Sequence, residues 1–271
     1  MLLLAPSAYT GEFGPVTVNH FGNSDYGDLL SQMQRFRGAT YLQDGAITKS
    51  ALDSEGRHRV EADFHSWHVL LLSGGMIRGC SRYTSHRISE SFESLGVARS
   101  ALAKSSQWGS KLRTAVERER RHALREGSTF VEVGGWAIAE ELRCSMEAIR
   151  IALTTYALGD RLGGCIGLTT ATARHNSASL LRRIGGHPMS VDSAELPKYF
   201  DPQYNCEMEI LRFDSSLPNA RFAPLVSRMK SEMASLPVVA PQRVQATRAQ
   251  PAPPPLRHVM GNSFGWSESL A

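Results

Sequence analysis

The residues best suited to do chemistry stand on one predicted strand, VEVGGWAI, near the middle of the chain. Two adjacent glycines, Gly134 and Gly135, interrupt an apolar run that spans 129–138. Glycine weakens a strand, so the pair indicates a β-bulge or a close approach of a ligand to the backbone. Glu132 precedes the pair by two residues and brings a carboxylate to this strand. The alternative is a bulge that only helps a helix to pack, with Glu132 pointing away from the core.

A second chemical candidate is the stretch ATARHNSASLLRRIGGHP, residues 171–188. Its pattern predicts the end of a buried strand, a short helix that begins at Asn176 and a stop at Gly185. His175, beside the helix start, is a candidate acid or base. The nine histidines show no spacing of metal ligands on a helix, so we expect no metal site.

The elements that must position these residues follow from hydrophobic periodicity. Gly74-Gly75 is a two-residue hairpin signal between two apolar runs, and Gly159 is expected to end a helix. The predicted strands are 15–21, 66–73, 76–83, 129–138, 163–171 and 206–213, and the predicted helices are 24–43, most of 89–126, 145–159, the segment after Asn176, and 217–236. This alternation predicts an α/β fold with a mixed sheet.

Length and composition allow one large domain followed by a tail. The chain has 271 residues, of which 42% are hydrophobic, and this is enough to bury a sizeable core. From Val239 the composition shifts to Pro, Gln, Arg and Ala, with PAPPP at 251–255. We therefore expect a domain over 1–238, with a helical extension at 216–238, and a disordered tail over 239–271.

The charge balance favours acidic partners without identifying one. The formal net charge is +4. The densest cluster, ERERRHALRE at 117–126, interleaves both signs, which is typical of a solvated helix face with spaced ion pairs. A docking surface for a carrier protein is the alternative. No aromatic-studded basic strand or DNA-reading motif accompanies the charge, so nucleic acid is not an expected partner.

The start of the chain and the cysteine pattern indicate the cellular compartment of the protein. The segment MLLLAPSAYT is too short an apolar run for a secretory signal or a membrane span. We therefore expect a cytoplasmic protein with no stable membrane insertion. The cysteines form no CxxC pair, which indicates buried thiols and neither a zinc site nor a disulfide framework. They are Cys80, Cys144, Cys165 and Cys206.

The 171–188 stretch resembles the last motif of the GNAT acyltransferase superfamily. Ala178, Leu180 and Gly185 match that motif, whereas Leu181 stands in place of its tyrosine and Gly186 in place of its phenylalanine. The resemblance implies a GNAT-like fold, with a central mixed sheet flanked by helices and splayed central strands. In that family the gap between the strands takes the pantetheine arm of the acyl donor, which implies donor contacts at Val133, Gly134, Gly135, Asn176 and Leu181.

A second motif of the GNAT family, Arg/Gln-x-x-Gly-x-Gly/Ala, contacts the acyl donor. The matching residues run from Arg143 to Ala148, which implies that Arg143 and Ser145 contact the donor at a helix N-terminus. Met146 replaces the central glycine and Glu147 adds a negative charge. This departure favours phosphopantetheine on acyl carrier protein over free acyl-CoA as the acyl donor, with no tightly bound cofactor.

The first half of the chain narrows the resemblance to the acyl-homoserine-lactone (autoinducer) synthases and the N-acyl amino acid synthases. The matching segments are MQRFRGATYLQDGAI, EADFHSW, IRGCSRY and FVEVGGWAI. Ser66 stands where the lactone synthases have the last aspartate of their acidic motif, which favours an amino acid acceptor. By this resemblance Glu132 is catalytic, and the substrate-binding residues are Arg37, Tyr41, Asp63, Arg82 and, beside the glycine pair, Trp136.

The resemblance as a whole implies an N-acyltransferase that moves a fatty acyl group to the amine of an amino acid. Other readings stay open: an autoinducer synthase, an acetyl-CoA-dependent enzyme, or a degenerate GNAT domain that only binds. Each site residue also has a structural alternative. Arg37 would reach solvent, and Arg82 with Asp63 would form a structural ion pair.

Overall fold

The structure is a computed structural model that describes residues 1–9, 23–143 and 145–241. The strands are β1 (Leu2–Leu4), β2 (Trp67–Ser73), β3 (Met76–His86), β4 (Thr129–Ile138), β5 (Cys165–Thr172), β6 (His187–Pro188), β7 (Ser190–Val191), β8 (Ala194–Glu195), β9 (Tyr199–Asp201), β10 (Cys206–Asp214) and β11 (Val238–Val239). The helices are α1 (Asn23–Gln43), α2 (Gly109–Arg125), α3 (Met146–Arg161), α4 (Ser177–Ile184) and α5 (Ala223–Met233). Short 3-10 turns at Phe92–Ser94 and Gly96–Arg99 lie between β3 and α2.

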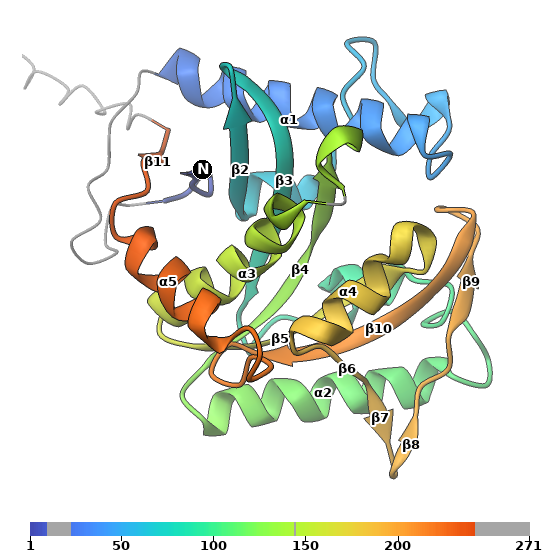
Figure 1. The fold of residues 1–271 in the computed structure, drawn as a ribbon. Helices are drawn as coiled ribbons and strands as arrows, with labels where there is room; N and C mark the ends of the chain where they lie inside the picture. The colour runs from blue at the N-terminus through green and yellow to red at the C-terminus, as the bar shows by residue number, and fades with distance from the viewer. Residues whose placement is uncertain (10–22, 144, 242–271) are drawn as a thin grey trace, which may run out of the picture.

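One mixed sheet organises the described residues, in the order β11-β1-β2-β3-β4-β5-β10-β6, with β9 added at β10 (Figure 1). The pairs β1–β11 and β4–β5 are parallel, and the other pairs of this order are antiparallel. The expectation of an α/β fold with a mixed sheet flanked by helices is confirmed.

Helices cover both faces of this sheet. On one face, Leu153 and Tyr156 of α3 and Met229 of α5 share a buried cluster with Val131 of β4. On the other, Leu30 and Met33 of α1 pack with Cys80 and Ala137, and Leu112 of α2 packs with Phe130. Alternate residues of each strand therefore serve two separate cores. We call these the α3 face and the α1 face.

The hairpin and most of the predicted elements are confirmed. Gly74 and Gly75 both have positive φ, 58° and 77°, as a tight turn between β2 and β3 requires. Helix α1, strands β4, β5 and β10 and helix α4 fall close to the predicted ranges. The predicted strand 15–21 lies outside the described residues.

Several predicted elements are wrong in detail. Much of 89–108 consists of turns, and only Gly109–Arg125 is an α-helix there. Helix α3 runs through Gly159 to Arg161, and Gly159 instead allows close packing, since an added Cβ would lie 2.4 Å from Cys165 Sγ. Gly163 and Gly164, with φ of 96° and 91°, follow the helix end. Strands β1, β6 to β9 and β11 were not predicted.

The boundary of the domain also shifts. Val239 pairs through β11 with Leu4, and both Val239 and Ala240 are buried, so the packed domain extends past the predicted end at 238. The rest of the predicted tail, 242–271, lies outside the described residues. Within residues 1–9, 23–143 and 145–241, no helix has the length and apolar character needed to span a bilayer. Cys80 and Cys165 are buried free thiols, Cys206 is half-buried, and Cys144 is not described.

Candidate active site

The central strands β4 and β5 separate halfway along their length. They pair from Thr129 opposite Cys165 as far as Glu132 opposite Leu168, and beyond that point no pairing is recorded between them. A cavity of about 310 Å³ opens there, lined by residues of both sheet faces. The expected splay of the central strands is confirmed. One edge of β4 is therefore left without a strand partner beside this cavity.

A β-bulge marks the place where the splay begins to widen. Arg82 of β3 pairs with Gly134, and Cys80 pairs with Ala137, so Ser81 alone faces both Gly135 and Trp136. Gly135 has a φ of +60°, which L-residues rarely adopt. The bulge predicted from the glycine pair is confirmed, and Gly135 is the residue whose conformation requires glycine.

The bulge reverses the sheet face toward which each side chain of β4 points after Gly135. Val133 and Trp136 both pack on the α3 face, although they are three residues apart, and Ile138 follows them there. Ala137 packs on the α1 face. An undistorted strand would have put Trp136 on the α1 face, because side chains alternate. The extra residue thus turns the indole toward the α3 face.

Two side chains on the α1 face bind the carbonyl groups of the bulge. The Cys80 thiol lies 3.4 Å from Gly135 O, and the Tyr41 hydroxyl donates to Trp136 O at 3.3 Å. Burial raises the pKa of both groups, that of Cys80 to about 11, so both stay protonated as hydrogen-bond donors. Tyr41 lines the cavity, and its hydroxyl holds the bulge in place.

Arg37 and Asp63 form a buried pair beneath the cavity. The guanidinium donates Nη1 to Oδ1 at 2.9 Å and Nη2 to Oδ2 at 2.7 Å, and the two side chains are 1% and 0% exposed. Gln34 also donates to Oδ2. Burial by itself would raise the pKa of Asp63, but the hydrogen bonds and charge of Arg37 outweigh it and hold that pKa well below its usual range. Arg37 therefore does not reach solvent, contrary to one alternative.

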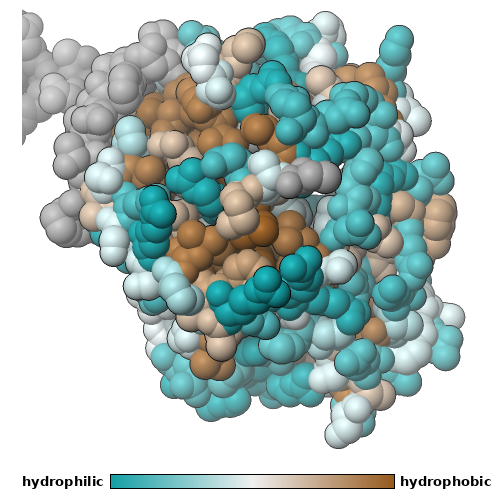
Figure 2. All heavy atoms as spheres, viewed as in Figure 1, coloured by the Kyte–Doolittle hydropathy of each residue, from teal (hydrophilic) through white to brown (hydrophobic). Residues whose placement is uncertain are grey.

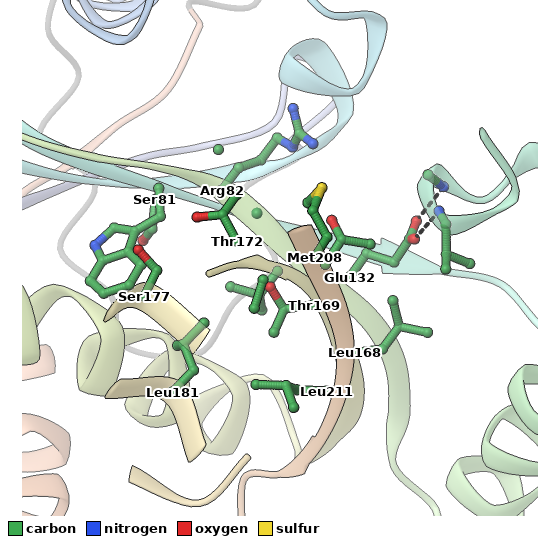
Figure 3. A pocket seen from close by; sticks show the side chains of 18 of the residues that line it. Ser81, Arg82, Glu132, Leu168, Thr169, Thr172, Ser177, Leu181, Met208 and Leu211 are labelled. Atoms are coloured by element: carbon green, nitrogen blue, oxygen red, sulfur yellow. Dashed lines mark hydrogen bonds between the residues drawn. The ribbon is translucent and has the colours of Figure 1, made fainter. Parts of the chain in front are cut away.

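Of the two arginines that contact Asp63, Arg82 is the one that remains available to a ligand. Its Nη1 touches Asp63 Oδ1 at a long 3.3 Å, its side chain is 20% exposed, and it lines the cavity. Its Nε is buried and has no hydrogen-bond partner among the described residues. The structural ion pair considered for Arg82 and Asp63 is present, but Arg37 makes the shorter, bidentate contact with Asp63. Figure 3 shows Arg82 extending from β3 beside the cavity.

Glu132 lies on the same face of the ladder as Arg82 and lines the cavity. Its Oε2 accepts from the amide of Gly96 at 2.6 Å, and its Oε1 accepts from the amide of Val97 at 2.7 Å, as the dashed lines in Figure 3 mark. His86 Nε2 lies 2.9 Å from Oε2. Although burial opposes it, these contacts lower the pKa of Glu132. A carboxylate offers about four acceptor positions, so one on Oε1 stays open.

A network behind Glu132 fixes one wall of the cavity. His86 Nδ1 pairs with Glu90 at 2.8 Å, and both carboxylates raise the pKa of His86 against the effect of burial. The Nη2 group of Arg120 donates to the carbonyls of Arg87, Ile88 and Glu90. Arg120 is buried, so the predicted solvated face at 117–126 is wrong for this residue. Sequence reasoning missed His86, for which no local signal exists.

At the N-terminus of α3 the chain's own groups already cap one amide and pair with Arg143. Ser145 Oγ accepts from the amide of Glu147 at 3.2 Å, and Arg143 pairs with Asp44 at 2.8 Å. Met146 is 54% exposed at the first helical position. Arg143 and Ser145 do not line the cavity themselves. A phosphate at this helix end would have to compete with these contacts.

The start of α4 forms the opposite edge of the cavity mouth. His175 and Asn176 both have positive φ, 53° and 58°, and His175 Nε2 lies 3.3 Å from Asp44 Oδ1. His175 lines the cavity, whereas Asn176 does not. Leu181 lines it from α4, and Figure 2 shows apolar side chains gathered in the hollow where α3 faces α4. The predicted donor-side residues therefore divide between the cavity wall and its rim.

The structure brings together most of the predicted site residues. Those that line the cavity are Arg37, Tyr41, Arg82, Glu132, Val133, Gly134, Gly135, Trp136 and Leu181. Asp63 lies behind them, in contact with both arginines. No group of three or more metal-ligating side chains is found in the parts of the chain that the structure describes.

Comparison with known proteins gives similarity in structure but none in sequence. No protein-family model and no curated protein matches the chain. The solved structure of a CoA-dependent acyl-homoserine lactone synthase, BjaI, with SAM and isopentyl-CoA, is 11% identical over 90% of this chain and 95% of that chain, with a TM-score of 0.51. The N-acyl amino acid synthase FeeM, from uncultured soil microbes, is 12% identical over 70% and 86%, with a TM-score of 0.45.

At such low identity the similarity concerns the fold, and function must be argued from the site. The chain adopts a GNAT-like fold and resembles the acyl-homoserine lactone synthase BjaI in architecture.

Proposed function

We propose that the protein is an N-acyltransferase that moves an acyl group from a thioester donor to the α-amine of an amino acid. The observation that carries the proposal is the pair of opposite charges on the α1 face, Arg82 and Glu132. Arg82 pairs with Gly134 and Thr84 pairs with Glu132, so the two charged residues are diagonal neighbours on adjacent strands. Both line the cavity beside the splayed strands.

An α-amino acid carries the complementary pair of charges. Its carboxylate would bind Arg82, whose Nε and Nη2 carry no recorded hydrogen bond among the described residues, in a charge-assisted contact. Its ammonium would lie toward Glu132. Diagonal neighbours on a ladder have Cα atoms about 7–8 Å apart, which leaves room for a small zwitterion between long side chains.

The reaction needs positioning of the two substrates and the removal of two protons from the ammonium. The amine nitrogen attacks the thioester carbonyl carbon, the C–S bond breaks, and an amide and a thiol are formed. We propose that the open position on Glu132 Oε1 receives one proton of the ammonium, directly or through a water. Because the pKa of Glu132 is lowered, this proton would pass on to the leaving thiolate, which is the stronger base. The second proton, lost from nitrogen as the amide forms, would pass to solvent water.

The acyl donor would approach from the α3 face. The unpaired edge of β4 offers backbone groups to a pantetheine arm, and apolar side chains from α4 and β10, such as Leu181 and Leu211, line the cavity for an acyl chain. Acyl carrier protein is favoured over acyl-CoA as the donor, because Ser145 and Arg143 are already paired at the helix end where a pyrophosphate would bind.

An autoinducer synthase is the second candidate, since the fold similarity includes a lactone synthase. The structure offers one observation against it. Ser66, at the position of the lactone synthases' last motif aspartate, is fully buried and bonded to Ala62 O and to the Thr84 hydroxyl. This position therefore offers no carboxylate to the cavity, which supports an amino acid product.

Mass spectrometry of lipids from cells that express the protein tests the proposal. We expect N-acyl amino acids with the wild type and with a surface control, Arg35→Gln, and none with Arg82→Gln. Acyl lactones would support the second candidate, and acetylated amines an acetyl-CoA-dependent enzyme. Folded protein without any product would leave a GNAT domain that only binds.

A further inference from the structure

Two buried polar atoms at the bulge lack partners. Ser81 is 3% exposed, yet its hydroxyl makes no hydrogen bond within the described residues. The indole Nε1 of Trp136 is buried and also unpaired there. Burying a hydrogen-bonding group without a partner is costly, and most such groups in proteins are satisfied. Both residues line the cavity, so a ligand there is the natural source of the missing partner.

Strand geometry places the two side chains together on the α3 face. Ser81 stands between Gly79, whose added Cβ would meet Ile151 of α3, and Tyr83, which packs in the α3 cluster. Alternation therefore puts Ser81 on that face. The bulge sets Trp136 opposite Ser81 and turns it to the same face. In Figure 3, Ser81 lies on the side of Ser177 and Leu181, and Arg82 extends away from them.

The chemistry of the pair selects an acceptor atom. The indole N–H only donates, and a serine hydroxyl donates readily, so the two converge on an oxygen that accepts. Leu181 and Leu211 pack together and line an apolar part of the same cavity. A thioester carries its carbonyl at the junction between a polar pantetheine arm and an apolar acyl chain, which corresponds to the boundary on which this pair stands.

We propose that Ser81 Oγ and Trp136 Nε1 donate hydrogen bonds to the carbonyl oxygen of the acyl donor's thioester. The inference rests on the proposed function, because it presupposes a thioester donor on the α3 face. As the amine attacks, this oxygen gains negative charge and the C–S bond then breaks, so both bonds would strengthen in the transition state. This makes Ser81 a catalytic residue in addition to those predicted from the sequence.

Binding of two unreactive ligands tests the contact without any turnover. One is the ketone analogue of octanoyl-pantetheine, with CH₂ in place of sulfur, and the other is S-octyl-pantetheine, which lacks that carbonyl. The variants are Ser81→Ala and Trp136→Phe, with Ser81→Cys as a second, size-conserving change. Ser215→Ala and Trp108→Phe are matched controls, since neither residue lines the cavity. Calorimetric titration and a thermal melt are recorded for each protein.

We expect Ser81→Ala and Trp136→Phe each to weaken binding of the ketone by about three- to tenfold, the worth of one neutral hydrogen bond. Binding of S-octyl-pantetheine should change by less than about twofold on the same scale. Unchanged ketone binding in stable variants, or equal losses for both ligands, would overturn the inference alone. If the wild type binds neither ligand, the proposed donor class is wrong and the inference falls with it.

Discussion

Replacement of Glu132 by glutamine is the most informative perturbation of this site. The two side chains have the same shape, so a pure general base would lose its function and keep its fold. In this structure, however, each carboxylate oxygen accepts from a backbone amide, of Gly96 and of Val97. A glutamine has only one oxygen, so its NH₂ group must face one of these amides, donor against donor. Glu132→Gln is therefore expected to destabilise the protein.

The expected magnitude follows from the broken contacts. One backbone N–H is left unsatisfied in a largely buried place, at a cost of about 1–3 kcal/mol. Loss of the charge partner of His86 adds to this. We expect a total near 3 kcal/mol, and a fall in Tm of about 6–12 °C for a domain of this size. The surface change Glu207→Gln should leave the Tm unchanged, because that side chain is half-exposed.

The stability difference between wild type and Glu132→Gln should depend on pH, because Glu132 and His86 have opposite pKa shifts. The pKa of folded Glu132 is lowered, so its contribution is present above the unfolded value near 4.5 and is lost as the pH falls through the folded pKa. The pKa of folded His86 is raised, so its contribution is complete below about 6.5 and is lost as the pH rises through the folded pKa. The gap between wild type and Glu132→Gln should therefore be widest between about pH 4.5 and 6.5.

The test is a series of thermal melts from pH 3.5 to 9. Activity is measured at each pH where the variant stays folded. If Glu132 receives the amine proton, the folded variant should lose on the order of a hundredfold in rate, and the deficit should shrink as the pH rises. An unchanged Tm at pH 5.5 would refute the reasoning about the amide contacts. Wild-type activity of the folded variant at neutral pH would remove Glu132 from the reaction.

Three further outcomes are expected. Asp63→Asn leaves the Arg37 guanidinium buried without its charge partner, so denaturant unfolding should show a loss of about 3–5 kcal/mol, while Asp160→Asn at the surface leaves the midpoint in place. An equal midpoint for both variants would contradict the role of the buried pair. Gly135→Ala forces a Cβ onto a φ of +60° and to 3.3 Å from Arg37 Nη1, so its Tm should fall by several degrees, and a stable, fully active variant would show that the bulge tolerates a side chain. With matched acyl groups, steady-state kinetics should show a higher kcat/KM for acyl-loaded carrier protein than for acyl-CoA. The reverse order would show that the contacts of Ser145 and Arg143 at the start of α3 do not set the choice of donor.

The sequence by itself determined most of the longer elements and one local distortion. Apolar patterns located α1, β4, β5, β10 and α4, and two glycine pairs located the β2–β3 turn and the bulge at Gly135. These features are local, because period and glycine content depend on neighbouring residues. The short strands β1 and β11 escaped prediction, since a run of two or three apolar residues becomes a strand only when a partner strand lies beside it.

The tertiary structure decided what each polar side chain does. Arg37, Asp63 and Arg82 were predicted as one set of substrate contacts, but only packing shows that the first two neutralise each other and that Arg82 is left to the cavity. The partners of Glu132 come from residues 86, 96 and 97, which no spacing rule connects to it. Burial sets the cost of an unpaired charge or donor, and burial is a property of the whole fold, so the roles of Ser81 and Trp136 at the bulge were visible only in three dimensions.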